Sequence, residues 1–187
     1  MRKVVVVPHD PQWATQFVLE ADRIKGALGA NLLSIYHIGS TAVPGLQAKP
    51  IIDIMPVVRD VAALDCRNEE MLELGYEALG EYGIVGRRYF RRIRDGRRTH
   101  HVHAFQYDNY RDIVRHLAVA DYLRARPDEA SAYGALKERL AQDYPSDWDQ
   151  YVDGKDAFVG ALERRALAWY LGLDSEAQEQ KKAIEED

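Results

Sequence analysis

The length, composition and charge of this chain are those of an ordinary globular domain and exclude several classes of protein. It has 187 residues, 47% of them apolar, a net charge of −5 and one cysteine. No apolar run reaches the roughly 18 to 20 residues that cross a bilayer, and the four valines of residues 4–7 are too few for a signal peptide. The negative charge argues against a general nucleic-acid-binding protein, and a single cysteine agrees with a reducing cytoplasm. We expect a cytoplasmic protein without a membrane segment.

Strands and helices alternate in the first half of the chain. Asp10 and Pro11 favour the start of a helix as N-cap and first-turn residue, and Gly29 can close it. Two short apolar segments flank a loop that contains Pro44 and Gly45, which predicts two strands joined by that loop. The expected elements are a strand at 4–7, a helix at 11–28, strands at 33–38 and 51–58, a helix at 61–74 and an irregular strand at 76–82.

Residues 86–107 are predicted to form a β-hairpin. The dipeptide Asp95-Gly96 is favoured in a two-residue type I′ turn, which would pair Arg94 with Arg97 and Arg88 with His103. Paired residues share one face, and a slip of one residue exchanges the two faces. In this register the open polar face carries Arg88, Phe90, Arg92, Arg94, Arg97, Thr99, His101 and His103, and the face that packs on helices carries Arg87, Tyr89, Arg91, Ile93, Val102 and Ala104. So many arginines with few acids nearby indicate an anionic ligand of limited size.

The second half of the chain is helical. Breaks before Pro127 and around Pro145 divide it into helices at roughly 110–125, 128–143 and 147–172, with Pro127 and Ser146 at two of the helix starts. We divide the chain into an α/β core at 1–108, a helical part of the same domain at 109–173 and a polar, flexible tail at 174–187.

Four sequence motifs resemble those of one protein family. The first runs from Gly39 to Ile54 and reads Gly-Ser-Thr-Ala-Val-Pro-Gly-Leu-Gln-Ala-Lys-Pro-Ile-Ile-Asp-Ile; the others lie at 83–90, at 98–103 and in the helical run 115–122. Over roughly residues 5–172 the chain resembles the GrpB family, small bacterial proteins placed in the nucleotidyltransferase superfamily. The resemblance implies an α+β fold, in which a nucleotidyltransferase-like mixed, mostly antiparallel sheet has helices on one face and is followed by a helical C-terminal part.

Asp53 is the leading catalytic and metal-binding candidate. It lies inside an apolar strand, where a carboxylate needs a partner of opposite charge. That partner is either a metal ion, in a functional site, or an arginine, in a purely structural ion pair. The superfamily's usual second acid, two residues away, is absent, since Ile51 and Met55 flank Asp53. On a later strand, His101 and His103 lie on one face about 6.5 to 7 Å apart. We expect these two histidines and Asp53 to bind a divalent metal: magnesium or manganese by the superfamily scheme, with zinc also suited to imidazole.

Phosphate-binding candidates surround the loop between the two central strands. A glycine and a hydroxyl residue at a strand end offer backbone N–H groups to phosphate, although Gly39-Ser40 is also common in ordinary turns. Arginine binds phosphate through a planar fork of donors, and a lysine early in the last helix could close over a triphosphate. The candidates are Gly39, Ser40, Thr41, Lys49, Arg88, Arg92 and Lys155; for the charged residues, solvated surface side chains are the alternative.

Three functions are compatible with these residues. The first is a nucleotidyltransferase-like enzyme that transfers a nucleoside monophosphate from a nucleoside triphosphate to a small acceptor with a divalent metal. The second is a catalytically degenerate module that binds a nucleotide or another phosphorylated ligand, since a similar domain is fused to dephospho-coenzyme A kinase in some bacteria. The third is a transition-metal hydrolase built on Asp53, His101 and His103.

Overall fold

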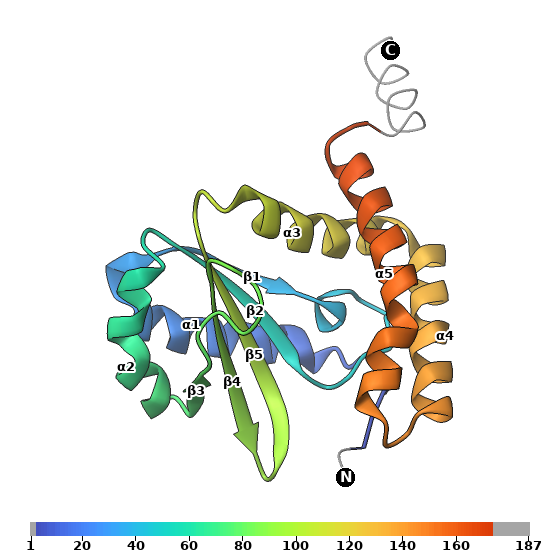
Figure 1. The fold of residues 1–187 in the computed structure, drawn as a ribbon, viewed down its shortest axis with the longest axis horizontal. Coiled ribbons are helices and arrows are strands. Elements are labelled where there is room, and N and C mark those ends of the chain that lie inside the picture. Colours follow the sequence, from blue (N-terminus) through green and yellow to red (C-terminus); the bar gives the residue numbers. More distant parts are fainter. Residues whose placement is uncertain (1–2, 174–187) are drawn as a thin grey trace.

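The computed structural model describes residues 3–173 and has a five-stranded sheet at its centre (Figure 1). The strands follow the order β1-β2-β5-β4-β3; β2 and β5 run parallel, and the other neighbours run antiparallel. This arrangement confirms the expected α+β class with a mixed, mostly antiparallel sheet. The strands are β1 (Leu32–Ile38), β2 (Ile52–Val58), β3 (Tyr76–Ala78), β4 (Arg87–Arg94) and β5 (Arg97–Gln106).

Two helices cover one face of the sheet, which we call the core face. Trp13, Ile24 and Leu28 of the first helix are buried there, at the spacing of one helix side. They pack with Ile54 and Phe90 of the sheet, which are at most 1% exposed. Burial of each such side chain contributes about 1.5 to 3 kcal/mol. The two helices are α1 (Gln12–Leu28) and α2 (Asn68–Glu73), with 3-10 turns at Gly29–Asn31 and Ala62–Arg67 beside them.

Three C-terminal helices lie beside the sheet and over one end of its second face (Figure 1). They are α3 (Tyr110–Ala125), α4 (Pro127–Asp143) and α5 (Trp148–Tyr170). Leu117 of α3 packs against a small core that contains Ile38, Met55 and Phe105 of the sheet. The remainder of the second face, which we call the site face, carries mainly polar side chains.

The hairpin of β4 and β5 has the expected turn but not the expected register. Arg94 pairs with Arg97 across a two-residue turn in which both φ angles are positive, as in type I′. The pairing then shifts by one residue between Ile93 and Arg92, so that Arg92 lies opposite His100. An extra residue in one strand of an antiparallel pair is a β-bulge.

The bulge exchanges the two faces of β5 relative to β4. Phe90 and Val102 share the core face and are each 1% exposed. Their burial, about 1.5 to 3 kcal/mol per side chain, favours this register over one that would leave Phe90 on the open face. The expected face assignment is therefore wrong: the site face carries Arg87, Tyr89, Arg91, His101 and His103, and the core face carries Arg88, Phe90, Arg92, His100 and Val102.

Four smaller expectations also differ from the structure. The helix expected at 61–74 is a 3-10 turn, Ala62–Arg67, followed by α2, and the irregular strand expected at 76–82 is limited to β3. Residues 4–7 do not form a strand, because their N–H groups bond to the carbonyl oxygens of Ala48 and Pro145 in two separate segments. Asp147, rather than Ser146, caps α5 by accepting a hydrogen bond from a first-turn N–H.

The described part of the chain has no helix that is long and apolar enough to cross a membrane. The polar tail expected at 174–187 lies outside the described residues.

Candidate metal and phosphate site

The sheet brings Asp53, His101 and His103 together on the site face, and we call these three residues the Asp53 cluster. Asp53 on β2 lies opposite His101 on the parallel strand β5, and His103 lies two residues further on the same face. Nδ1 of His101 is 3.1 Å and Nε2 of His103 is 3.7 Å from Oδ1 of Asp53. One donor atom from each residue lies within 4.8 Å of the others, which is close enough for all three to bind one ion.

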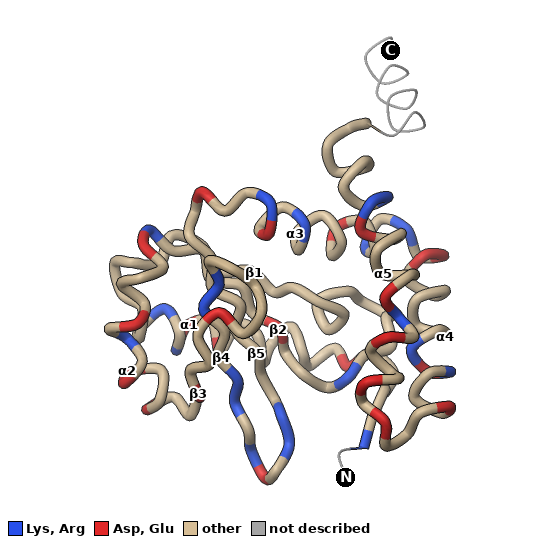
Figure 2. Tube along the Cα trace, in the orientation of Figure 1, with Lys and Arg blue, Asp and Glu red and all other residues tan. Residues whose placement is uncertain are grey.

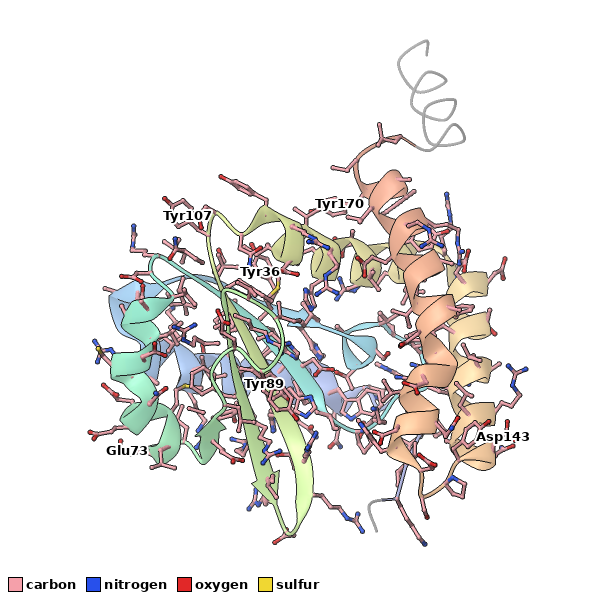
Figure 3. The ribbon with its side chains drawn as sticks, viewed as in Figure 1. Tyr36, Glu73, Tyr89, Tyr107, Asp143 and Tyr170 are labelled. Carbon is pink, nitrogen blue, oxygen red and sulfur yellow. The ribbon has the colours of Figure 1, made fainter. Side chains whose placement is uncertain are left out.

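Neighbouring side chains on β4 hold the two imidazoles in place. The ring centre of Tyr89, labelled in Figure 3, lies 5.5 Å from that of His101 and 5.2 Å from that of His103. The guanidinium of Arg87 lies 3.3 Å from Nδ1 of His103 and also donates to backbone carbonyl oxygens in the loop at 81–82. Because Arg87 is itself held by the backbone, it fixes the orientation of His103.

Burial and hydrogen bonding set the charge state of the Asp53 cluster. Burial alone would raise the pKa of Asp53, but the hydrogen bonds and charge of His101 and His103 outweigh it and lower the pKa below its ordinary value. Burial lowers the pKa of His103. A guanidinium can only donate hydrogen bonds, so Nδ1 of His103 accepts the hydrogen bond from Arg87. The proton of the neutral His103 ring is then on Nε2, which faces Asp53. The cluster thus has an ionised Asp53 carboxylate beside the neutral imidazole of His103. Metal binding at Nε2 of His103 would release the proton that this nitrogen carries.

The donor set suits a transition-metal ion better than magnesium. One carboxylate oxygen and two imidazole nitrogens are typical ligands for zinc, manganese or iron, whereas magnesium takes oxygen ligands. Within residues 3–173, Asp53 is the one carboxylate of the cluster. Nε2 of His101 is buried and has no hydrogen-bond partner among the described residues. Buried polar nitrogens are rarely left unpaired, which favours an external ligand at this place.

Gly39 allows the loop after β1 to approach the carboxylate of Asp53. Its φ of 70° lies in the region that side-chain-bearing residues rarely adopt. A Cβ atom at this position would lie 2.6 Å from Oδ2 of Asp53, so the loop or the Asp53 side chain would have to shift. The following residue, Ser40, begins a short 3-10 turn at Ser40–Ala42 and is therefore held next to the Asp53 cluster.

Three lysines lie on the other side of Ser40, and we call them the lysine cluster. Lys137 of α4 is 3% exposed and donates a hydrogen bond from Nζ to Oγ of Ser40 at 2.9 Å. Nζ of Lys49 and Nζ of Lys155 lie 5.0 and 4.6 Å from the centre of the Tyr151 ring. Both lysines also act on Lys137 through charge repulsion. The structure thus brings the predicted residues Ser40, Lys49 and Lys155 together around an unpredicted one.

Burial makes the positive charge of the lysine cluster costly. Burial first, and then repulsion from Lys155 and Lys49, lowers the pKa of Lys137 to about 7. Burial also lowers the pKa of Lys155. The ring of Tyr133, whose centre lies 4.3 Å from Nζ of Lys137, compensates in part. An anion with several charges would relieve the repulsion among these ammonium groups.

The loop between β1 and β2 joins the two clusters because it docks on the C-terminal helices. Apolar side chains of the loop are buried among α3, α4 and α5. Arg124 of α3 donates two hydrogen bonds, at 3.0 and 2.9 Å, to the carbonyl oxygen of Ala42. Gly134 lets α4 approach the loop, since a Cβ atom there would overlap the side chain of Gln47. These contacts place the lysine-bearing face of α4 beside Ser40.

Two arginines that were expected to bind phosphate lie on the core face instead. Arg88 forms a bidentate ion pair with Asp65, at 2.7 and 2.9 Å. Arg92 donates to the buried carboxylate of Glu20 at 2.6 Å and to His100 at 2.9 Å. The predicted positions are wrong because the bulge in the hairpin reverses which β4 residues share a face with the predicted histidines.

Thr41, another expected phosphate contact, faces inward. It is 2% exposed, and its hydroxyl donates to the carbonyl oxygen of Ile51 at 3.2 Å. Burial lowers the pKa of His37 to about 4, so the neutral imidazole donates from Nε2 to the Thr41 hydroxyl at 3.0 Å. The threonine therefore fastens the loop to β1 and to the residue before β2, and its contact with phosphate stays a prediction.

Sequence reasoning missed Lys137 and Arg87. Lys137 occupies a buried position of α4, in the same stripe as Ala130, Gly134 and Leu140. A lysine within an apolar helix stripe is the signal that could have identified it. Arg87 was placed on the opposite face of β4, and no local feature of the sequence predicts the bulge that moves the histidines to its side.

Comparisons with known proteins identify the family. A family model described as GrpB protein matches residues 3–165. The chain belongs to the GrpB family. The crystal structure of conserved protein GrpB from Enterococcus faecalis superposes with a TM-score of 0.86 at 46% sequence identity, over 89% of this chain and 99% of that chain. The family resemblance expected from the motifs is confirmed.

Other proteins that the chain matches are longer than this chain. UPF0157 protein YqkA of Bacillus subtilis is 42% identical over 93% of this chain and 50% of that protein. A dephospho-CoA kinase of Mycolicibacterium paratuberculosis is 31% identical over 89% of this chain and 46% of that protein. The chain therefore spans about half the length of either relative. Terminal uridylyl transferase 4 from Trypanosoma brucei with bound UTP and UMP aligns with a TM-score of 0.47 at 16% identity, over 73% of this chain and 43% of that chain.

Proposed function

We propose that this protein binds a nucleoside triphosphate between the lysine cluster and the Asp53 cluster and transfers its nucleoside monophosphate to a small acceptor. The position of Gly39-Ser40 carries this proposal. Gly39 packs on the carboxylate of Asp53, and Ser40 accepts a hydrogen bond from Lys137. One short segment thus connects the candidate metal ligands to one buried and two half-buried lysines, and metal-bound phosphates are the ligands that need both.

Each part of the site would act on a different portion of the nucleotide. The ammonium groups of Lys49, Lys137 and Lys155 would neutralise the β- and γ-phosphates, with Ser40 as a hydrogen-bonding partner. A divalent ion held by the Asp53 cluster would neutralise charge near the α-phosphorus. In the transfer, an acceptor oxygen bonds to the α-phosphorus, and the bond from that phosphorus to the bridging oxygen breaks. Pyrophosphate leaves with the electron pair, and the acceptor proton passes to water.

Calorimetric titration with ATP, GTP, CTP and UTP tests the binding half of this proposal. Each nucleotide is titrated with manganese, with magnesium and with a chelator. We expect manganese-dependent binding that Asp53→Asn weakens by at least about tenfold. Asp65→Asn is the matched control, because it removes an equal charge from the exposed 3-10 turn that pairs with Arg88, away from the Asp53 cluster. Equal affinity with metal and with chelator, or equal losses in the two variants, would contradict the proposal.

The donor set also supports a second candidate function, a transition-metal hydrolase. Asp53, His101 and His103 would hold a transition-metal ion, which would supply Lewis-acid activation for the hydrolysis of a phosphate ester. Metal analysis of the purified protein and hydrolysis of p-nitrophenyl phosphate separate the two candidates. Stoichiometric zinc or manganese with turnover that His101→Gln abolishes would favour the hydrolase, while His100→Gln on the opposite face serves as the control.

A phosphate-binding module without catalysis is the remaining alternative. It is supported by the single carboxylate of the cluster and by relatives such as the mycobacterial dephospho-CoA kinase, in which a similar segment accompanies another enzyme. Triphosphate binding that is equally strong in chelator and in Asp53→Asn, with no release of pyrophosphate, would favour this module over the transferase.

A further inference from the structure

A basic cavity lies next to the proposed nucleotide site. Its volume is about 580 Å³, which is within the range of small-molecule sites. It opens between the tip of the β4–β5 hairpin, the N-terminal segment, the start of β2 and the start of α5. Its cationic lining residues are Lys3, Lys49, Arg91, Arg97 and Arg98.

The cavity carries five cationic side chains and no carboxylate among the described residues that line it. Figure 2 shows this gathering of basic residues along both strands of the hairpin and at the N-terminal segment. Arg91 is compensated by an ion pair with Glu77 at 2.6 Å. Within residues 3–173, however, Arg97 and Arg98 form no ion pair with a carboxylate. Cations gathered in a concave site attract an anion of matching size.

The cavity also has an apolar wall. Val5, Pro50 and Ile93 line it beside Trp148, and Nζ of Lys49 lies 3.9 Å from the centre of the Trp148 ring. Such a mixture fits a ligand with an apolar or ring-shaped body and one or more acidic groups, because the wall covers the body while arginines bind the acidic groups in bidentate geometry. An inorganic ion has no apolar part that could contact this wall.

Three residues connect the cavity to the proposed nucleotide site. Lys49 lines the cavity and also belongs to the lysine cluster. Arg91 lies directly opposite His101 in the hairpin, on the site face. Tyr89 lies two residues before Arg91 on the same face of β4. Since Tyr89 packs on both histidines of the Asp53 cluster, a molecule in the cavity would lie beside the metal ligands.

We infer that this cavity binds the acceptor and that the acceptor is a small organic anion with phosphate or carboxylate groups on an apolar body. The identification of the ligand as the acceptor rests on the proposed transferase function. The presence of an anion site in the cavity does not. The anionic groups would contact Arg97 and Arg98, and the apolar body would lie against Val5, Pro50 and Ile93. The acceptor's reacting oxygen would then point towards the α-phosphate held near the Asp53 cluster.

A matched set of probes tests the site: 1-naphthyl phosphate, 1-naphthoate and the uncharged 1-naphthol, titrated by calorimetry without metal. We expect 1-naphthol to bind at least about tenfold more weakly than the tighter of the two anions. Whichever anion binds more tightly identifies the preferred acidic group. Binding of all three probes with equal affinity would overturn the anion site.

Variants of the hairpin locate the binding. Arg98→Gln should weaken the tighter anion by about tenfold, whereas Arg94→Gln, which removes an equal charge from the same hairpin outside the cavity, should change it by less than about twofold. Arg98→Lys, which keeps the charge, should recover part of the affinity. Equal effects of Arg94→Gln and Arg98→Gln would show a general charge effect and overturn the site.

The same titrations with manganese and a nucleoside triphosphate separate this inference from the proposed function. We expect the loss caused by Arg98→Gln to be at least about tenfold larger for the naphthyl anion than for the nucleotide. Lys137→Met should instead cause a larger loss of affinity for the nucleotide than for the naphthyl anion. Failure of nucleotide binding with intact, Arg98-dependent anion binding would refute the transferase and leave the anion site. If Lys137→Met removes both ligands equally, the naphthyl anion occupies the lysine cluster and the separate site is wrong.

Discussion

Nζ of Lys137 lies 2.9 Å from Oγ of Ser40, although the two residues are 97 positions apart in the chain. The contact joins the C-terminal helices to the loop that touches the carboxylate of Asp53. Among residues 3–173, no carboxylate forms an ion pair with Lys137, and a buried lysine without one is costly for stability. Its position next to a hydroxyl residue is therefore better explained by a ligand than by folding.

The first prediction is that Lys137 increases the affinity for triphosphate but lowers the stability of the ligand-free protein. Lys137→Met removes a desolvated charge and keeps the length of the side chain, so we expect the free energy of unfolding of the ligand-free protein to rise by about 1 to 3 kcal/mol. The same change should weaken triphosphate binding by at least about tenfold. Urea denaturation and calorimetry measure the two effects. Lys25→Met on the exposed side of α1 should change neither; a destabilised Lys137→Met with normal binding would contradict the prediction.

The second prediction follows from the pKa of Lys137, which burial lowers from its ordinary 10.5 to about 7. Between these values the folded protein binds fewer protons than the unfolded chain, so the free energy of unfolding should increase with pH, by at most about 1.4 kcal/mol per pH unit. Below about pH 7 the lysine is protonated in both states and this dependence ends. Subtracting the unfolding curve of Lys137→Met from that of the wild type, between about pH 6 and 10, isolates the effect.

Ligand binding should have the opposite pH dependence. A phosphate group binds the ammonium form of Lys137, so affinity for a triphosphate should fall as the pH rises above about 7. Near that pH, binding should take up a proton, which calorimetry in buffers of different ionisation enthalpy detects. Proton release on binding, after correction for metal, would argue against contact between the phosphates and this lysine.

The third prediction separates two costs at Gly39. Gly39→Ala requires a strained positive φ and also brings Cβ within 2.6 Å of the Asp53 carboxylate. Gly45→Ala is the control, because Gly45 has a similar φ of 78° but a Cβ atom there would meet nothing within 4 Å. Both variants should lose about 1 to 2 kcal/mol of stability from the backbone. Only Gly39→Ala should also lose metal-dependent nucleotide binding; equal binding by the two variants would mean that the close approach is irrelevant to the site.

The fourth prediction tests the register of the hairpin. Glu20 is 4% exposed and accepts hydrogen bonds from Arg92 and Tyr76. Glu20→Gln leaves the guanidinium buried without its counter-charge, and we expect a loss of about 3 to 5 kcal/mol in the free energy of unfolding. Asp65→Asn, which breaks the exposed pair with Arg88, should cost less than about 1 kcal/mol. Urea denaturation of both variants provides the measurement, and similar small losses would indicate that Arg92 does not lie in the core.

The order of elements and part of the site could be predicted from the sequence because the responsible signals are local. Proline at the first position and an apolar repeat mark α4, and Asp95-Gly96 marks the hairpin turn. Asp53 stands out as a lone acid in an apolar strand, and His101 and His103 alternate in a strand pattern. Each of these features depends on neighbours within a few residues, so it can be identified without knowing the fold.

The register of the hairpin could not be predicted in the same way. The turn was correct, but the bulge beside Arg92 depends on which strand face packs on α1. The burial of Phe90 and Val102 stabilises this register by more than the burial of Arg92 destabilises it. The cost of burying Arg92 is small because Glu20 of α1 supplies a counter-charge inside the core. That counter-charge lies 72 residues away from Arg92 in the sequence, and nothing near the hairpin indicates it.

By itself, the sequence determined the class of elements, their order, the loop chemistry of Gly39-Ser40 and the residue types that can bind metal and phosphate. Only the tertiary structure decided which of them meet. It paired β2 with β5, so that Asp53 faces His101, and it turned the buried side of α4 towards Ser40, so that Lys137 became part of the site. The physical reason is that propensities, caps and turns act over a few residues, whereas faces and contacts between distant segments are chosen by the burial of the whole core.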